Sequence, residues 1–463
     1  MFSLSSLPVD VLIVVLESCR VDELTALSLT CHALYSLVTE YGWSSYLRAN
    51  PRPSCSLSKA RQLWLPAVRA QYDVMVDSAW TYPHFVARPL SRMWAGKLQP
   101  VMAISPHRLI VGAGSSLYSY GFGAAKGSAS SPPIVFEGVV SLLDGPEHAR
   151  NITAISFILD DGATAILDVA FQDGAIERTR LTNTRHIAGG APVLSCTRNK
   201  GAHMPDNDFV ESISVNAGSV LALSTNGHAR LSSNHTDFSG AATTHALINL
   251  QSRSWVAHLC MEASTPYAAF GTASTTPLNI YTIADGGALA PRPTAILHTK
   301  RGADLPPDML PSSAVYGLAR GPLNSPWGSS PQILVSGWFD GQVRCYDLRS
   351  SARAAPNGAP GGAPHLRPVL SLVDRWSYEP IYSVACGGGS AAHIAAGTAR
   401  HSVVSFWDVR APATSWSVHA PGNDPSPVYS VVLESSRFFG VTQSRPFVYD
   451  FVSALSNFVS NDD

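Results

Sequence analysis

The chain has 463 residues, of which 14% are charged, and its formal net charge at pH 7 is −1. Its 35 glycines and 33 prolines favour many short strands and turns over a helical bundle or a solvated tail. The near-zero net charge argues against binding to nucleic acid or to a membrane surface. The seven cysteines are scattered without a CxxC pair, which predicts reduced thiols, no structural zinc, and a location in the cytoplasm or nucleus.

The first predicted element is a helix over residues 7–19. Six apolar residues, Val11 to Leu16, stand between two acidic residues, and the first basic residue, Arg20, follows the run. A signal peptide has its basic region before the apolar run, and a membrane helix needs roughly 18 apolar residues. The run is therefore predicted to be an amphipathic helix, with Pro8 in its first turn. The apolar stripe at helical spacing consists of Val11, Leu12, Val15, Leu16 and Cys19.

Two more short helices are predicted after it. The second has Asp22 as its N-cap and carries Leu24, Leu27 and Cys31 on one face. Three short helices in some forty residues bury little surface, so the unit is marginal alone and its surplus apolar residues are predicted to face a partner. The apolar face of the third helix consists of Leu34, Leu37, Val38 and Tyr41, with Trp43 and Leu47 beyond it.

The first fifty residues resemble the F-box family. The landmarks, within residues 4 to 48, are Leu7-Pro8-x-Asp10-x-Leu12, Asp22-Glu23-Leu24, Cys31-His32 and Trp43, in the order and spacing of that pattern. The F-box is a three-helix module that docks on the Skp-type adaptor of cullin–RING ubiquitin ligases, so the resemblance implies such a module over residues 1–50. The alternative is a plain helical subdomain packed on the rest of the chain. The adaptor-binding residues that the resemblance implies are Leu7, Pro8, Val11, Leu12, Leu16, Leu24, Leu27, Cys31 and Trp43.

Residues 51–94 are predicted to be a helical linker. Pro51 and Pro53 break the chain, and SLSKARQLWLPAVRAQY (56–72) has the spacing of an amphipathic helix that Pro66 weakens. A flexible linker would be rich in Gly and Ser. The segment is therefore expected to be a packed spacer between two modules.

A repeated unit runs from residue 95 onward. Its best copies are ILVSGWFDGQVRCYDLR (333–349) and HIAAGTARHSVVSFWDVR (393–410), each a hydrophobic strand, a tight turn and an alternating strand that closes on an aromatic-Asp pair. Five weaker copies bring the number of units to seven, at intervals of roughly 45 to 65 residues. Residues 95–463 are therefore predicted to form a seven-bladed WD-type β-propeller, so the fold is mainly β. The last sheet is expected to take its outer strand from residues 86–95.

An F-box followed by WD-type blades resembles the F-box/WD-repeat protein family, most closely its dactylin branch. The segments that carry this resemblance are VSGWFDGQVRCYDLR, SPVYSVVLESSRFFGV and FVYDF. It implies a non-catalytic substrate receptor of a Skp–cullin–F-box ubiquitin ligase, whose partners are the Skp-type adaptor, the cullin and a target protein. One alternative is an F-box/WD-repeat scaffold without ligase activity. Another is a propeller hydrolase or sugar-binding module, which predicts clusters of polar carboxylates in the central channel that VYSVVL and VESISV do not supply.

No motif predicts a catalytic, metal or cofactor site. Gly112-x-Gly114 lacks the lysine and the following helix of a phosphate-binding loop, so a turn explains it better. His228, His235 and His245 do not make up a plausible metal-binding set and are expected to be solvated loop residues. GxSxG and HExxH motifs are absent from the sequence, so we expect no enzymatic activity.

A target-binding face is predicted on one rim of the propeller, where the turns between the second and third strands of the blades lie. Arg400 and Arg445, in turns of neighbouring blades, are expected to pair with a phosphate or carboxylate of a target peptide. Trp338 and Tyr378 are predicted to be apolar anchors. The alternative is that the arginines are solvated and the aromatic residues pack within the blades.

Overall fold

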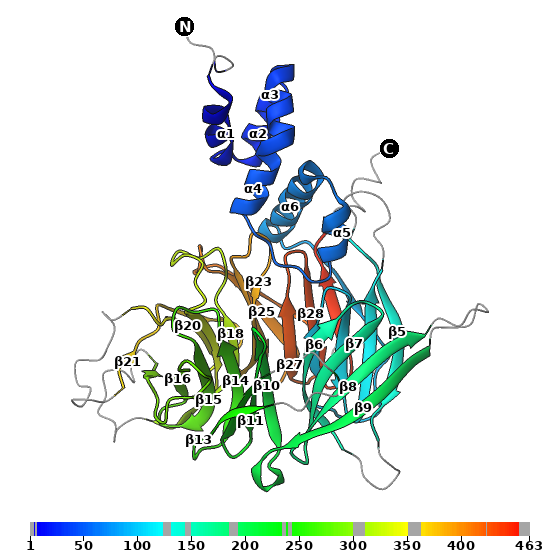
Figure 1. Cartoon of the computed structure of the whole chain (residues 1–463), viewed down its shortest axis with the longest axis vertical. Coiled ribbons are helices and arrows are strands. Elements are labelled where there is room, and N and C mark those ends of the chain that lie inside the picture. Colours follow the sequence, from blue (N-terminus) through cyan, green and yellow to red (C-terminus); the bar gives the residue numbers. More distant parts are fainter. Residues whose placement is uncertain are drawn as a thin grey trace.

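A computed structural model describes residue 4 and residues 7–123, 131–143, 150–184, 193–233, 238, 243–299, 311–350, 363–422 and 424–452. In this part of the chain, a ring of β-sheets carries a group of α-helices on one rim (Figure 1). None of the described helices combines the length and the hydrophobicity needed to cross a membrane. The architecture is mainly β and propeller-like, with the α-helices in the N-terminal part of the sequence.

The α-helices precede the first strand. They are α1 (Val9–Glu17), α2 (Val21–Ser28), α3 (His32–Leu37), α4 (Trp43–Ala49), α5 (Ser58–Leu63) and α6 (Pro66–Thr81), with the π-helical segment η2 (Val38–Gly42) between α3 and α4. α1 starts directly after Pro8, which is its N-cap. The N-cap of α2 is Arg20 rather than the predicted Asp22, because the Arg20 N–H donates to the Glu23 carboxylate at 2.7 Å.

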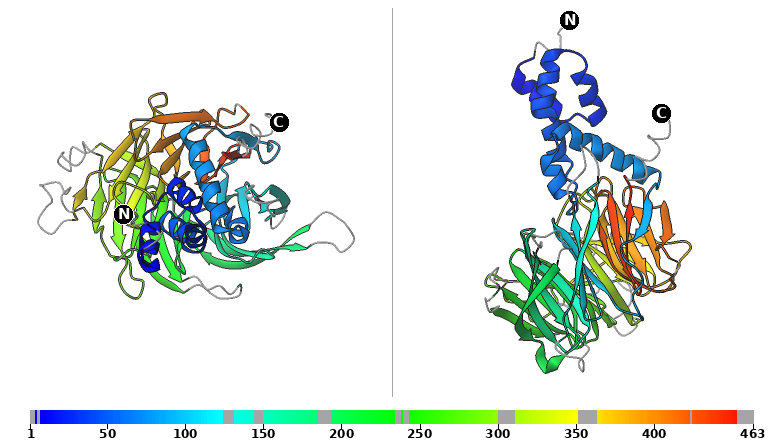
Figure 2. Two further views of the ribbon diagram at one scale, coloured as in Figure 1. Left: turned by 90° about the horizontal axis from the view of Figure 1, so that it is seen from above. Right: turned by 90° about the vertical axis from the view of Figure 1, so that its right-hand side faces the viewer.

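Helices α1 to α4, together with η2, form what we call the helical module. Its core contains Leu16, Leu24, Val38 and Trp43, and Ala70 of α6 packs into the same core. The module projects away from the propeller (Figure 2). Its packing therefore runs through α6, which lies between the module and the ring of sheets.

Five of the sheets have four antiparallel strands each. In spatial order they are β1 (Val86–Pro89), β29 (Pro446–Asp450), β28 (Arg437–Thr442) and β27 (Val428–Leu433); β2 (Val101–Ile104), β3 (Arg108–Ala113), β4 (Ser116–Phe122) and β5 (Ile134–Ser141); β6 (Ile152–Asp160), β7 (Thr164–Phe171), β8 (Ala175–Thr184) and β9 (Val193–His203); β10 (Val210–Asn216), β11 (Ser219–Ser224), β12 (His228–Ser233) and β13 (Thr244–Asn249); and β23 (Ile381–Gly387), β24 (His393–Thr398), β25 (Val403–Asp408) and β26 (Ser415–His419). A 3-10 turn, η3 (Pro205–Asn207), precedes β10.

The sixth sheet has nine strands, so the prediction of seven separate blades is wrong in its count. The strands are β14 (Ser254–Cys260), β15 (Tyr267–Ser274), β16 (Leu278–Thr282), β17 (Ala295–Leu297), β18 (Ser313–Arg320), β19 (Ile333–Trp338), β20 (Gln342–Asp347), β21 (His365–Leu366) and β22 (Leu370–Val373). The two halves join because β15 pairs with β18 at Ala273–Ala314 and Ser274–Ser313, and β21 adds to β17 in parallel. Repeat patterns in sequence do not reveal such short cross-pairing.

The expected closure of the ring is confirmed. β1 pairs antiparallel with β29 from Val86–Asp450 to Pro89–Phe447, so a strand that precedes the repeats completes the C-terminal sheet. Leu90 continues the contact, since its N–H donates to the Pro446 carbonyl at 2.9 Å. Pairing removes the free edge that β29 would otherwise present.

Candidate functional site

The structure divides the predicted adaptor-binding residues into two groups. Leu12, Leu16, Leu24 and Trp43 are buried in the helical module, so their side chains hold the module together and are not available to a partner. Leu7, Pro8, Val11 and Cys31 are exposed, and Leu27 is half-buried. The prediction of a single apolar stripe on α1 is wrong, because Leu12 and Leu16 point inward whereas Val11 points to solvent.

Sequence reasoning missed the most exposed apolar residues of the module. Val14 is 63% exposed, Leu29 is 81% exposed, and Val9 and Tyr35 are exposed as well. At 100° per residue, Val14 lies on the side of α1 opposite to Leu12 and Leu16, and Val11 lies beside Val14. A helical wheel that assigned two faces to α1, one for the core and one for a partner, could have found them. Exposed apolar residues of this kind mark interaction surfaces when they gather.

The linker joins the helices firmly to the propeller. The Ser56 backbone N–H donates to the Glu434 carboxylate at 3.0 Å, and the Ser56 hydroxyl donates to the same group. The Tyr72 hydroxyl donates to Ser436 at 3.0 Å. Arg61 forms an ion pair of 2.7 Å with the buried Asp73, which fixes α5 against α6. The helical module is thus carried on a spacer that is part of the propeller's packing.

These contacts identify the rim that carries the helices. Residues 434–436 connect β27 to β28, so first-to-second-strand connections lie on the helical side. Because successive strands are antiparallel, the second-to-third-strand turns lie on the opposite rim, which we call the distal rim. The predicted turn residues Arg400 and Arg445 are both on the distal rim.

Of the predicted target-binding residues, Trp338 is not available to a partner. Its side chain is 0% exposed and its Nε1 donates to Ser336 at 2.8 Å, so it is a core residue and the anchor prediction is wrong for it. Tyr378 is 77% exposed, and Trp376, two residues before it, is 88% exposed. Aromatic type alone does not distinguish Trp338 from Tyr378, since only the register of β19 turns the indole inward.

Neighbouring turns of the distal rim are connected through hydrogen bonds. The Glu379 carboxylate accepts from the Arg400 N–H at 2.8 Å and is hydrogen-bonded to the His401 side chain. Burial raises the pKa of Glu379, but its hydrogen bonds with His401 and neighbouring groups outweigh this and lower it overall. Asp424 accepts from the Ser444 hydroxyl, beside Arg445, and its backbone carbonyl accepts from the Ser402 hydroxyl in the Arg400 turn. The two predicted arginines therefore belong to one connected rim.

Two glycines of the distal rim stand where any other residue would be strained and would clash with its neighbours. Gly341 has φ +78°, and a side chain there would meet the backbone of Tyr378 and Glu379 at 3.0–3.1 Å. The 339–341 turn therefore lies directly against the segment that carries Tyr378. Gly422 has φ +114°, and the Arg445 guanidinium occupies the space that a side chain would fill.

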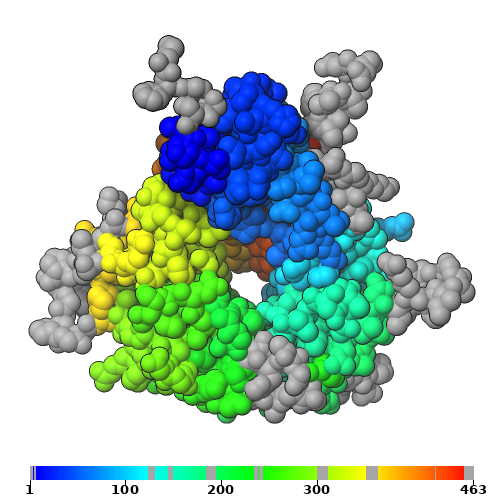
Figure 3. All heavy atoms as spheres, turned by 45° about the horizontal axis from the view of Figure 1, so that its top comes forward, coloured from blue at the N-terminus to red at the C-terminus, as the bar shows by residue number. Residues whose placement is uncertain are grey.

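A channel of about 930 Å³ runs through the ring and is lined mainly by the innermost strands. Figure 3 shows it as an opening between the sheets, with the helices at its upper edge. Four aromatic residues near the starts of innermost strands line it, and we call them the aromatic arc: Trp255, Tyr316, Tyr382 and Tyr429. Consecutive ring centroids are 5.0, 5.2 and 6.1 Å apart.

The aromatic arc was missed by sequence reasoning although a signal for it exists. In AVYGLAR, IYSVACG and VYSVVL the tyrosine stands at the same place in the unit, at the entry to the first strand. Strand starts lie at the distal rim, so repetition of this position around the ring brings the aromatic rings together. Comparing the repeats position by position would have predicted the arc.

Charged groups border the arc. Arg253 lies over the Trp255 ring, 4.0 Å from its centroid, and pairs with Glu211 at 3.3 Å. Among the described residues that line the channel, Glu211 is the only carboxylate. Burial raises the pKa of Tyr382, and the nearby Arg400 partly offsets this. Two of the histidines expected in a solvated loop lie in strands instead. His228 in β12 is half-buried and hydrogen-bonded to Asn249, and His245 in β13 is exposed, while His235 lies outside the described residues.

Comparisons with known proteins identify no family. No family model and no curated protein matches the sequence. Among solved structures, Sqt1 from Saccharomyces cerevisiae is 12% identical with a TM-score of 0.45, over 77% of this chain and 82% of that chain. A computationally designed protein, Ika8, is 14% identical with a TM-score of 0.42, over 78% of this chain and 98% of that one. At these values neither likeness indicates a function.

Proposed function

We propose that the chain is a non-catalytic substrate receptor of a Skp–cullin–F-box ubiquitin ligase. In this proposal the helical module docks on the Skp-type adaptor and the propeller presents a target protein, in the cytoplasm or nucleus. The observation that carries it is the set of exposed apolar side chains on the helical module, which includes Val14, Leu29 and Tyr35. If the helical module only packed on the propeller, these apolar side chains would be buried against it.

The arrangement of the modules supports the same role. The helical module is supported by α6, and α6 is anchored on the propeller rim opposite the distal rim. The distal rim therefore stays free of the helices (Figure 2). A receptor needs such a spacing, since its contribution is to hold the target near the recruited conjugating enzyme. The proposed domains are the F-box over residues 1–50, the linker over 51–94 and the propeller over 95–463, with β1 as a strand contributed by the linker.

The nine-stranded sheet consists of two halves. Two residue pairs join its halves, and each half has its own innermost strand, β14 or β18. Both of these strands line the channel, as do β2, β6, β10, β23 and β27. The membership in the F-box/WD-repeat family, dactylin branch, is proposed on the sequence resemblance.

The test is co-purification of the full chain with a Skp-type adaptor and a cullin. Val14→Asp plus Leu29→Asp places charges on exposed positions, so folding is preserved while adaptor docking is lost. Leu63→Asp, at an exposed position of α5, is the matched control and keeps full capture. Leu12→Asp is unsuitable because Leu12 is buried and the module itself would unfold. The proposal is overturned if the wild-type chain captures no adaptor, or if the wild type and both variants capture it equally.

The alternative function is a scaffold that binds the adaptor without ligase activity. It predicts capture of the adaptor but not of the cullin. Target levels would then be unchanged when cullin activity is inhibited, whereas the receptor proposal requires that the target accumulates. The channel gives no support to the hydrolase alternative, because Glu211, the one carboxylate among its described lining residues, is already paired with Arg253.

A further inference from the structure

The distal end of the channel has the features of a peptide-binding site. We infer that it binds a short, extended, acidic segment of a target protein, with one aromatic or aliphatic side chain inserted on the aromatic arc and a carboxylate paired with Arg400. This deepens the proposed function, since it rests on the propeller being the target-presenting part. It assigns a binding role to Trp255, Tyr316, Tyr382 and Tyr429 in addition to Arg400.

The aromatic arc offers a concave apolar surface. Its four residues are partly exposed, so each ring retains a face that can contact a ligand. Their centroid separations of 5.0–6.1 Å make an unbroken row across four innermost strands. A side chain placed there is surrounded by ring carbons, which gives the buried anchor that dominates many interfaces. The channel volume admits side chains and an extended segment but no folded domain.

The charges around the arc select an acidic segment. The acids around the arc already have partners. Glu211 pairs with Arg253, Glu379 is hydrogen-bonded to the His401 side chain and the Arg400 N–H, and Asp424 accepts from the Ser444 hydroxyl. The Arg400 guanidinium is exposed and forms no ion pair within the described part of the chain. A carboxylate on the ligand would therefore find an available cation near Tyr382, whereas a lysine or arginine would meet only acids that already accept hydrogen bonds.

Exposed aromatic residues extend the surface beyond the channel. Phe339 is exposed and its ring lies 6.5 Å from that of Tyr316, centroid to centroid, which links it to the aromatic arc. Trp376 and Tyr378 are the next exposed aromatics, on the segment packed against Gly341. A small molecule held in the channel would leave these residues uncovered. An extended peptide that leaves the channel over the rim would contact them.

The experiment uses the full chain and three fluorescein-labelled peptide pools of about ten residues each. One pool has a central Phe flanked by Asp and Glu, one has a central Phe flanked by Lys and Arg, and one has a central Ala flanked by Asp and Glu. Fluorescence anisotropy measures the affinity of each. We expect the acidic Phe pool to bind at least about tenfold more tightly than either of the others.

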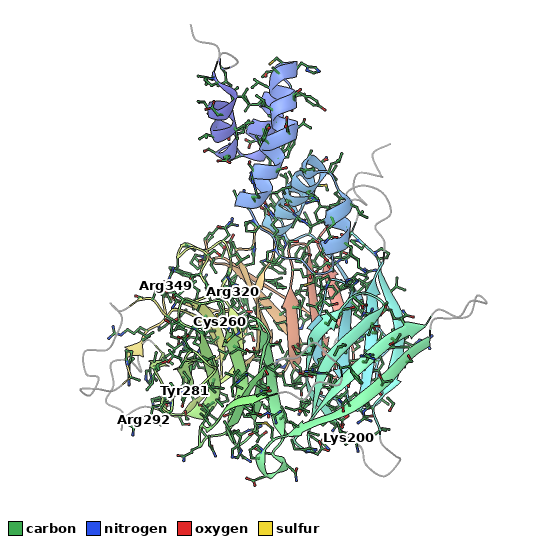
Figure 4. The ribbon with its side chains drawn as sticks, in the orientation of Figure 1. Lys200, Cys260, Tyr281, Arg292, Arg320 and Arg349 are labelled. Atoms are coloured by element: carbon green, nitrogen blue, oxygen red, sulfur yellow. The ribbon has the colours of Figure 1, made fainter. Side chains whose placement is uncertain are left out.

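Two variants and a control assign the binding to the arc. Arg400→Glu, at an exposed position, is expected to lower the affinity for the acidic Phe pool by about tenfold and to shift the preference towards the basic pool. Tyr382→Leu keeps an apolar side chain but removes the aromatic ring. It is expected to lower the affinity for the acidic Phe pool by a similar factor. Arg292→Glu changes an exposed arginine at the outer edge of the propeller (Figure 4) and leaves all affinities unchanged. Thermal unfolding confirms that each variant is folded.

Each contrary result overturns the inference. The inference fails if the acidic Phe pool does not bind at concentrations up to about 1 mM, or if the basic Phe pool binds with equal affinity. It also fails if Arg400→Glu leaves the affinities unchanged, or if a single-stranded oligouridine probe binds more tightly than the acidic Phe pool. Adaptor capture separates this inference from the proposed function. If the chain captures the adaptor but binds no peptide, only the peptide-binding inference is wrong. If it binds the peptide but captures no adaptor, the ligase role is wrong and the peptide-binding site stands.

Discussion

The indole ring of Trp80 stacks on the phenyl ring of Phe451, with 4.0 Å between the ring centroids and 17° between the ring planes. The Trp80 Nε1 also donates a hydrogen bond of 2.8 Å to the Ser435 carbonyl. Gly388 and Gly389 leave room for the indole, since a side chain at either position would meet it at 2.8–3.1 Å. The end of α6 is thereby inserted between two sheets of the propeller.

Replacing Trp80 is expected to destabilise the whole chain. Trp80→Ala removes a buried indole, leaves a cavity beside Phe451 and should lower the free energy of unfolding by about 3–5 kcal/mol. Chemical denaturation followed by circular dichroism measures the change. The control is Trp376→Ala, which alters a side chain that is 88% exposed and should change stability by less than about 0.5 kcal/mol. Equal effects of the two substitutions would contradict the anchoring role of Trp80.

The Glu434 carboxylate is expected to fix the segment before α5. Glu434→Ala leaves the Ser56 N–H without its acceptor, which should cost about 1–3 kcal/mol and increase local opening. Hydrogen exchange at residues 54–57 measures that opening directly. Glu262→Ala removes an exposed ion pair of 2.7 Å with Arg320 and serves as the control with little effect. Unchanged exchange in Glu434→Ala would show that other contacts hold the segment.

The closing strand is expected to keep the propeller monomeric. A fragment that begins at residue 95 lacks β1, so β29 becomes an unpaired edge with a row of free backbone groups. A fragment that begins at residue 84 retains the pairing. Size-exclusion chromatography with light scattering should find the longer fragment monomeric and the shorter one associated or aggregated. The prediction fails if both fragments behave alike.

Acid is expected to destabilise the protein partly through His298. Its side chain is buried and stacked on His365 at 4.6 Å, and burial lowers its pKa to about 4. An unfolded chain has a histidine pKa near 6.5, so below that pH the unfolded state binds the proton more readily. Stability should therefore fall as the pH drops from about 6.5 towards 4, by about 1–2 kcal/mol at pH 5.

His298→Phe tests this contribution, because phenylalanine keeps the ring but cannot be protonated. Thermal unfolding of wild type and variant at pH 7 and pH 5 gives the pH dependence of each. We expect the loss of stability between these values to be smaller in the variant. The interpretation is wrong if both proteins lose the same amount.

Local patterns were sufficient to predict the repeated hairpins of the propeller. Alternating apolar residues on both sides of Asp340-Gly341 predicted β19 and β20, because the short 339–341 turn with a positive φ at Gly341 needs few long-range contacts to form. The weaker copies over 152–181 and 210–233 also form consecutive antiparallel strands. The number of separate sheets was not predictable, because the link between β15 and β18 depends on how neighbouring strands meet in space.

The amino-acid sequence by itself determined that helices precede residue 82, that strands make up the repeats and that a strand from residues 86–95 closes the last sheet, since each depends on a local period or on a strand lacking a partner. Only the tertiary structure decided which apolar side chains are buried. It placed Leu12 in a core and Val14 in solvent, and it buried Trp338 while leaving Tyr378 exposed. Periodicity fixes the spacing of side chains along an element, whereas the neighbours packed against each face decide which side is covered. The aromatic arc shows the same division, because its rings meet only when the ring of sheets closes.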